Sequence, residues 1–335
     1  MLGLSAFPSF GANSSTNNFT QKRILPKRLQ KGNTIGLITP AAPVKKEQLT
    51  SAIEKLESQG FQVYYLPSVL DEYGYFAGKD EDRAAELMHM FENNKVDGIM
   101  CLRGGYGTSR ILDLLDFNTI KQNPKPFIGY SDITVLNLAI SQKTGLVTYH
   151  GIMGVSDFNP FAIESFEKVI MQHEKSYKYD YCRESATEEN PEFDQYTITE
   201  GKARGYLTGG NLSLLASLTG TKYQPNFRNK LVIIEEVGEE THRVDKMLVQ
   251  LIMGTNLKEA AGIILGVFKK CNDDSEIASL SLKQALDDLL KPLNIPTAYG
   301  LPFGHIDNKI TIPMGIFAEF NAHKPTLKLL ENPTS

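Results

Sequence analysis

Strand-like and helix-like segments alternate along the first half of this chain, and this alternation constrains the fold more than any other feature. Residues 34–39 form a short apolar run typical of a strand. In the following residues 46–59 apolar side chains recur at helical spacing, and Gly60 stands where a helix C-cap glycine belongs. The alternation continues with expected helices at 80–93 and 108–115 and expected strands at 61–66, 96–102 and 127–130. Repeated β-α-β units predict a parallel sheet covered by helices, which binds its ligand at the carboxyl ends of its strands.

The second half resumes this alternation after a charged interruption. Residues 164–200 carry many charged side chains with weak periodicity, which favours a helix end and an exposed linker. After Gly201 we expect helices at 212–218, 243–253 and 280–290, strands at 231–234, 261–268 and 297–299, and paired strands within 309–320. The sequence therefore predicts an α/β protein with three parts: an N-terminal parallel-sheet domain of flavodoxin or Rossmann type at 31–165, a linker at 166–200, and a smaller C-terminal α/β domain with mixed strands at 201–335.

Length and composition exclude several classes of protein. The 335 residues suffice for two domains with sizeable cores. A formal net charge of −4 argues against a nucleic-acid-binding protein, which usually carries a basic excess. No apolar stretch approaches the roughly 20 residues of a membrane span, so no membrane partner is expected. Cys101, Cys182 and Cys271 are scattered without a CxxC pair, which argues against a disulfide framework or a structural zinc site.

The first 30 residues stand apart from the predicted domains. Residues 1–12 are mildly apolar but lack a charged N-terminal region, Pro8 interrupts them, and residues 13–18 are polar without a pattern. We expect a disordered tail on a cytoplasmic protein. The alternative is the remnant of an export signal, and with it an exported or periplasmic location.

Ser131 stands between the apolar run at 127–130 and a helical pattern at 133–140. A serine on a sharp strand-to-helix turn is held out of the regular backbone, beside free helix N–H groups, which is the geometry that a nucleophile needs. Ser131 and Asp132 are also preferred N-cap residues, and this segment by itself favours a cap.

A nucleophilic serine needs a base and a third group that orients the base. Of the six histidines, His150 and His305 each follow a short apolar run and touch a glycine, so each fits a loop at a strand end. A histidine satisfied by the backbone of a turn explains either one about as well. Glu235 is the first polar residue after the apolar strand at 231–234; it either meets a cationic partner there or begins, with Glu236, a solvated acidic loop.

The glycine-rich segment Arg103-Gly-Gly-Tyr-Gly107 follows one predicted strand and precedes a helix. Glycines there let backbone N–H groups approach a ligand closely. The segment could hold a phosphate, although it fits neither G-x-G-x-x-G nor the P-loop pattern. It could instead provide N–H groups that join that of Asp132 in an oxyanion hole. No His/Cys/Asp cluster has metal-ligand spacing, so no metal is expected.

Seven short motifs occur along the chain, each weak alone. They are Ile35-Gly-Leu-Ile-Thr-Pro-Ala41, Leu102-Arg-Gly-Gly-Tyr-Gly107, Gly129-Tyr-Ser-Asp-Ile-Thr134, Gly209-Gly-Asn211, Val232-Ile-Ile-Glu-Glu236, Arg243-Val-Asp-Lys-Met-Leu248 and Gly300-Leu-Pro-Phe-Gly-His305. In this order, from about Lys31 to the C-terminus, they make a chain that resembles the LD-carboxypeptidase family, serine peptidase family S66. This family includes muramoyltetrapeptide carboxypeptidases and microcin C self-immunity proteins.

The resemblance implies a Ser-His-Glu triad with Ser131 as nucleophile, His305 as base and Glu235 as the orienting carboxylate. Because Ser131 belongs to the first predicted domain and the other two to the second, the site should lie between the domains. By resemblance, the enzyme hydrolyses the L,D amide bond between meso-diaminopimelate and the terminal D-alanine of a murein tetrapeptide, in cell-wall peptide recycling. No cofactor is needed, because the serine supplies the nucleophile.

The remaining expectations concern binding groups and partners. We expect the N–H groups of Gly105 and Asp132 to hold the oxyanion, Arg103 to bind the substrate's free carboxylate, and Asn211 to contribute to substrate binding. The expected partners are a small murein peptide and a second copy of the chain in a homodimer. Two alternatives are a microcin C immunity-like hydrolase of peptidyl or aminoacyl nucleotides and a non-catalytic α/β ligand-binding protein.

Overall fold

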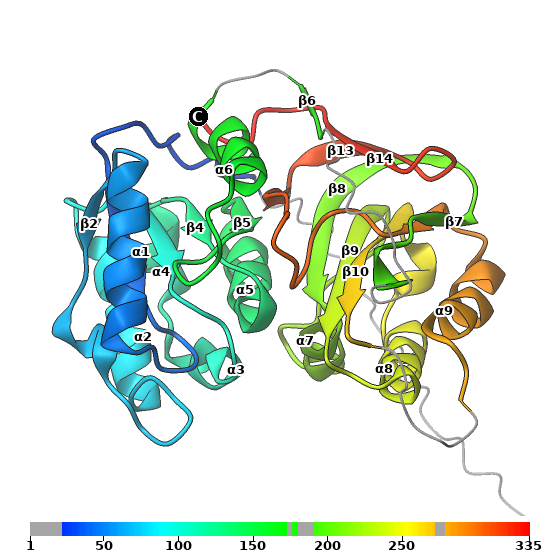
Figure 1. Ribbon diagram of the computed structural model, residues 1–335, viewed down its shortest axis with the longest axis horizontal. Helices are drawn as coiled ribbons and strands as arrows, with labels where there is room; N and C mark the ends of the chain where they lie inside the picture. The colour runs from blue at the N-terminus through cyan, green and yellow to red at the C-terminus, as the bar shows by residue number, and fades with distance from the viewer. Residues whose placement is uncertain (1–21, 173–175, 180–190, 272–278) are drawn as a thin grey trace, which may run out of the picture.

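The first of two β-sheets, with the helices around it, forms one half of the protein (Figure 1). The computed structural model describes residues 22–172, 176–179, 191–271 and 279–335. The strands of this sheet are β1 (Thr34–Ile38), β2 (Gln62–Tyr64), β3 (Gly98–Cys101), β4 (Phe127–Ile128), β5 (Thr148–His150) and β12 (Ile312–Met314). Its helices are α1 (Lys46–Ser58), α2 (Asp80–Glu92), α3 (Thr108–Ile111), α4 (Phe117–Gln122), α5 (Thr134–Thr144) and α6 (Pro160–Phe166).

The second sheet forms the other half together with three helices. Its strands are β6 (Tyr177–Lys178), β7 (Tyr196–Thr199), β8 (Lys202–Asn211), β9 (Lys230–Val237), β10 (Gly262–Lys269), β11 (Thr297–Tyr299), β13 (Phe317–Asn321) and β14 (Thr326–Leu329). The helices are α7 (Leu212–Leu218), α8 (Thr241–Gly254) and α9 (Leu282–Leu290).

The strand orders confirm the predicted α/β class. The first sheet runs β12-β5-β4-β3-β1-β2, and its neighbours are parallel except for β12, which is antiparallel to β5. The second runs β6-β14-β13-β8-β9-β10-β11-β7, with a parallel centre from β8 to β11 and antiparallel strands at both edges. Ser131 follows the carboxyl end of β4, and Glu235 lies close to the carboxyl end of β9.

Side chains of the first sheet alternate between two apolar layers, as expected for strands buried on both faces. On β3, Ile99 and Cys101 belong to the layer under α2, α4 and α5, whereas Met100 belongs to the layer under α1 and α6. The helices bury the stripes that their periodicity predicts, for example Leu49 and Leu56 on α1.

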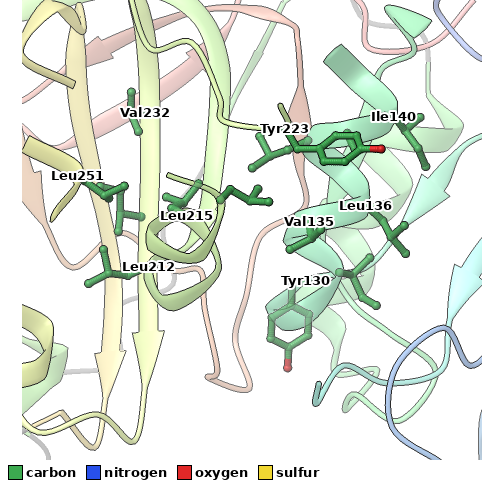
Figure 2. Close-up of a cluster of buried hydrophobic side chains, with 14 of the residues drawn as sticks. Tyr130, Val135, Leu136, Ile140, Leu212, Leu215, Tyr223, Val232 and Leu251 are labelled. Atoms are coloured by element: carbon green, nitrogen blue, oxygen red, sulfur yellow. The ribbon is translucent and has the colours of Figure 1, made fainter. Parts of the chain in front are cut away.

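One apolar core runs from the first half into the second. It joins side chains of α5, such as Val135, to Leu212 and Leu215 on α7 (Figure 2). Every residue from Asp132 to Ile140 is buried, because α5 lies between its own sheet and α7. The two halves therefore share a packed interface.

The predicted pairing within residues 309–320 is wrong. β12 and β13 belong to different sheets: Ile312 pairs with His150 on β5, whereas Phe317 pairs with Tyr206 on β8. Gly315 turns the chain between them with φ of +87°, which a residue with a side chain rarely adopts. The chain thus returns to the first sheet before it finishes the second.

The predicted linker and N-terminal tail differ in how far the structure describes them. The segment expected as an exposed linker contains β6 and β7, which pair with β14 and β11 in the second sheet. The domain boundaries themselves stay predictions, as does the N-terminal tail, of which residues 1–21 lie outside the described part of the chain. Cys182 lies outside it as well. None of the described helices is long and apolar enough to cross a membrane.

Candidate active site

Ser131 occupies a strained turn between β4 and α5. Residues Ser131–Ile133 form a single 3₁₀ turn, and Ser131 itself has φ of +64°. A left-handed backbone in a residue with a side chain costs roughly 1–3 kcal/mol and is found most often at functional sites. Gly129 permits the turn, since a Cβ there would stand 2.9 Å from the Ile133 side chain. The turn holds the Ser131 hydroxyl out of the regular backbone.

His305 links this hydroxyl to a buried carboxylate. Its Nε2 lies 3.0 Å from Ser131 Oγ, and its Nδ1 lies 2.8 Å from Glu235 Oε2. Gly304 allows the close approach, because a Cβ there would stand 3.1 Å from Glu235 Oε2 and 3.0 Å from the Val267 carbonyl oxygen. The three side chains come from both halves of the protein and form one continuous chain of hydrogen bonds.

The carboxylate of Glu235 is held in its charged form. Its side chain is fully buried, which by itself pushes the pKa up. The charge and hydrogen bond of His305, with smaller contributions from His150 and Asn211, outweigh burial and bring the pKa of Glu235 below its ordinary value. A buried anion next to Nδ1 fixes the imidazole tautomer whose Nε2 can accept the serine proton.

Glu236 points away from this chain of hydrogen bonds. Its carboxylate accepts hydrogen bonds from Asn211 Nδ2 at 2.9 Å and from the Ser213 hydroxyl at 2.6 Å, at the start of α7. Burial raises its pKa. Consecutive residues of a strand face opposite sides of a sheet, so only Glu235 of this pair faces His305.

The glycine-rich loop lies directly against Ser131. A Cβ on Gly104 would stand 3.1 Å from Ser131 Oγ and 3.3 Å from the Asp132 backbone nitrogen. The next residue, Gly105, is exposed and has φ of +113°. This loop and the start of the 3₁₀ turn therefore border the space in front of the hydroxyl, where an oxyanion would form.

Buried polar side chains fix the loop. The Asp132 carboxylate accepts a hydrogen bond from the Thr108 backbone N–H at 2.9 Å, and burial raises its pKa. The Arg83 guanidinium, only 1% exposed, donates to the carbonyl oxygens of Pro40 and Gly107, the latter at 3.0 Å. Arg83 and Asp132 were not singled out as loop supports by sequence, because neither has a local signal for that role.

The two predicted substrate-binding residues are placed differently. Arg103 is half-buried beside the loop, and its Nη1 donates to the Pro43 carbonyl oxygen at 3.3 Å. Asn211 is 2% exposed; its Oδ1 accepts from the Leu214 N–H as the cap of α7. Its backbone N–H donates to Thr134 Oγ1 at 3.0 Å across the two halves. Asn211 thus acts on neighbouring protein groups, and its contact with substrate stays a prediction.

His150, the other histidine that sequence left open, lies at the same site. Its ring centre is 5.8 Å from that of Tyr130, which in turn lies 5.0 Å from the His305 ring. Burial lowers the pKa of His150 to about 4, so its ring is neutral at ordinary pH. Within the described part of the chain, no group of His, Cys, Asp or Glu side chains could hold a metal ion.

A hydroxyl, an imidazole and a buried carboxylate in one hydrogen-bonded chain, beside a loop of backbone N–H groups, are the arrangement used by serine hydrolases. Residues 35–151 match the LD-carboxypeptidase N-terminal domain, and residues 204–320 match the LD-carboxypeptidase C-terminal domain. The chain therefore belongs to the LD-carboxypeptidase family and is a serine-type carboxypeptidase.

Individual relatives cover nearly the whole chain. The probable murein peptide carboxypeptidase of Bacillus subtilis is 40% identical over 306 residues, which cover 90% of this chain and 92% of that protein. Among solved structures, an MccF-like protein from Bacillus anthracis shares 28% identity with a TM-score of 0.81, covering 92% of this chain and 99% of that one. The muramoyltetrapeptide carboxypeptidase from Oxalobacter formigenes shares 29% identity with a TM-score of 0.77, covering 89% and 98%.

Proposed function

We propose that this enzyme hydrolyses the L,D amide bond that joins diaminopimelate to the terminal D-alanine of murein tetrapeptides, through a triad of Ser131, His305 and Glu235. The observation that carries the proposal is the continuous hydrogen-bonded path from Ser131 Oγ through His305 to Glu235. The names of the relatives from Bacillus subtilis and Oxalobacter formigenes support the substrate class.

The first chemical step is acylation. Ser131 Oγ attacks the amide carbonyl carbon while His305 Nε2 takes the hydroxyl proton, and the carbonyl oxygen becomes an oxyanion. His305 then returns this proton to the nitrogen of the leaving D-alanine, the C–N bond breaks, and the rest of the peptide stays as an ester on Ser131. Glu235 stabilises the imidazolium that exists between the two transfers.

The second step releases the shortened peptide. Water enters in place of D-alanine and gives a proton to His305 as it attacks the ester carbonyl carbon. The ester C–O bond then breaks, and His305 returns the proton to Ser131 Oγ. In both steps the negative oxygen needs donors, and the N–H groups of Gly105 and Asp132 fit this role because their loop and turn border the hydroxyl.

The terminal carboxylate of the substrate can be bound by an arginine or by helix N–H groups near the leaving group. Arg103 remains our candidate, because it starts the loop that borders Ser131 and its guanidinium is half-exposed. A lysine or methionine in its place should raise KM for the tetrapeptide and leave kcat nearly unchanged, if the contact is equally strong in the ground and transition states.

A second candidate function uses the same triad. The likeness to an MccF-like structure supports the alternative that the family resemblance implies, a hydrolase of peptidyl or aminoacyl nucleotides. The two candidates differ in what lies beyond the scissile bond, so parallel assays on a murein tetrapeptide, a murein pentapeptide and an aminoacyl sulfamoyl nucleotide separate them. Release of D-alanine from the tetrapeptide alone supports the first proposal, and cleavage of only the nucleotide substrate supports the second.

The triad is tested by Ser131→Ala, His305→Ala and the double variant, with His89→Ala on α2 as the control. Each triad substitution should lower kcat by several orders of magnitude, and the double variant should be little worse, because triad members act as a unit. A fluorophosphonate probe should label the unaltered enzyme but not Ser131→Ala. Additive losses, or labelling that survives Ser131→Ala, would refute the triad.

Compartment and assembly stay proposals as well. We propose a cytoplasmic location, which cell fractionation tests, and a homodimer, which sedimentation velocity tests. Recovery of the protein with the exported fraction, or a species of monomer mass across the working concentration range, would contradict them.

A further inference from the structure

His150 presents a buried imidazole whose hydrogen-bonding groups are unused. It ends β5, it is 2% exposed, and neither of its ring nitrogens has a hydrogen-bond partner among the described residues. Its ring packs edge-on against Phe303 at 6.2 Å and tilts against Tyr130 at 5.8 Å. A buried polar side chain without a partner is uncommon and calls for a physical explanation.

One oxygen of the Glu235 carboxylate also lacks a hydrogen-bond partner among the residues that the structure describes. Oε2 is bonded to His305 Nδ1, but the buried Oε1 has no partner in the described part of the chain. The neighbouring Asn211 amide also lowers the pKa of Glu235, but the acceptor of its hydrogen bond is Glu236 Oε1, at 2.9 Å. An anionic oxygen left unpaired in the interior loses much of its solvation, and a donor nearby would restore it.

These two groups border the same cluster of side chains. The His150 ring contacts Phe303, and a Cβ on the next residue, Gly304, would stand 3.1 Å from Glu235 Oε2. After burial, the charge of Glu235 is the largest influence on the pKa of His150, and His150 in turn lowers the pKa of Glu235. The other titratable groups facing the His150 ring are His305 and Lys309, both on the loop after β11, and Tyr130 after β4. A neutral imidazole has one N–H donor, and Glu235 Oε1 is an acceptor that lacks one.

We propose that His150 is a positioning residue of the active site: its neutral imidazole donates a hydrogen bond through one bound water to Glu235 Oε1, and so holds the carboxylate toward His305. The inference rests on the proposed triad. The pair of histidines that sequence could not separate then has two roles, His305 as the base and His150 as support for the carboxylate that orients the base.

Neutrality is what suits His150 to this role. A protonated imidazole beside Glu235 would compete with His305 for the carboxylate and weaken the stabilisation of the catalytic imidazolium. Because burial keeps the pKa of His150 at about 4, the ring can donate a hydrogen bond near neutral pH without carrying charge. The surrounding rings of Tyr130 and Phe303 supply the apolar environment.

The test compares His150→Phe, which keeps an aromatic ring but no donor, with His150→Asn and His150→Gln, which place an amide donor near the positions of Nδ1 and Nε2. We expect His150→Phe to lower kcat on the order of 10- to 100-fold, with KM nearly unchanged. The acid limb of its pH profile should move to higher pH, because a Glu235 carboxylate that has lost this donor has a higher pKa.

One of the two amide variants should recover most of the lost kcat and return the acid limb toward its original position. His89, a half-buried histidine on α2 whose Nε2 lies 3.0 Å from the Tyr64 hydroxyl, is the matched control. His89→Phe and His89→Gln should leave kcat and the acid limb unchanged, since that ring lies away from the triad.

Three outcomes would overturn the proposal. They are an unshifted acid limb in His150→Phe, equal losses in the Phe, Asn and Gln variants, and a wild-type His150 ring whose nitrogen NMR shifts titrate between pH 5 and 8. The last measurement needs no variant, so it holds even where a substitution fails to fold. If Ser131→Ala kept its activity, the triad itself would fail, and that result is separate from any result at His150.

Discussion

The backbone at Ser131 should destabilise the protein in a way that glycine relieves. Ser131→Ala and Ser131→Gly both remove the hydroxyl, but only alanine keeps a side chain at φ of +64°. The left-handed conformation destabilises the folded alanine variant by about 1–2 kcal/mol. Glycine avoids this cost, but its greater freedom in the unfolded chain destabilises the glycine variant by about 0.4–1 kcal/mol. We therefore expect Ser131→Gly to exceed Ser131→Ala in free energy of unfolding by about 0.5–1 kcal/mol.

Urea unfolding at pH 7 measures this difference, followed by circular dichroism and by tyrosine fluorescence, since the chain contains no tryptophan. Glycine and alanine variants at two other positions serve as controls for the effect of backbone conformation. At Asn294, exposed with φ of +55°, glycine should again be more stable than alanine. At Ser51, inside α1, glycine should be less stable than alanine by about 1 kcal/mol. The strain argument fails if alanine equals or exceeds glycine at Ser131 while both controls behave as expected.

Three further predictions rest on single contacts. Gly104→Ala should lower kcat on the order of 100-fold, because the new Cβ would stand 2.9 Å from the Ser131 Cβ; steady-state kinetics with an unchanged kcat would contradict this. Burial raises the pKa of Glu86 to about 7, so the folded state holds this proton more tightly than the unfolded chain. The resulting stability is present at low pH and is lost as the pH rises from about 4.5 to 7. Between urea titrations at pH 4 and pH 8, the free energy of unfolding of wild type should therefore fall by up to about 3 kcal/mol relative to that of Glu86→Gln. If the free energies of the two proteins change equally with pH, the prediction is refuted. Thr134→Val leaves the buried Asn211 N–H unpaired and should lower the free energy of unfolding by about 1–3 kcal/mol, whereas an unchanged urea midpoint would show that this contact contributes nothing.

The parallel sheets could be predicted because their signal is local. Apolar runs and helical periodicity place β1, β3, β9 and β10 within a few residues of their observed bounds. The sheet to which β12 belongs could not be predicted. Its partner β5 lies more than 160 residues earlier, and no pattern within Ile312–Met314 identifies that partner. Pro313 fits only because β12 is an edge strand, where one missing N–H donor is tolerated.

In the candidate site, too, only the features with a local sequence pattern could be predicted. The strand-to-helix turn at Ser131 is a local pattern, so the sequence shows it. The choice between Glu235 and Glu236 follows from strand alternation only when one knows which face of β9 meets the loop of His305. No local sequence pattern shows which of His150 and His305 contacts Ser131. The rings of both histidines lie against Tyr130, one from each half of the protein.

The interface between the halves explains how Ser131, His305 and Glu235 are held within hydrogen-bond distance of one another. Ser131 belongs to the first half and Glu235 and His305 to the second, so a mobile interface would separate them. Instead, α5 packs against α7 in a shared apolar core. The buried N–H of Asn211, directly before α7, donates across this interface to Thr134, the first residue of α5. Packed cores resist gradual deformation, so folding sets the distances of 3.0 Å from Ser131 Oγ to His305 Nε2 and of 2.8 Å from His305 Nδ1 to Glu235 Oε2. Strain at Ser131 persists for the same reason: the residues that could relax it are buried on both sides of the turn.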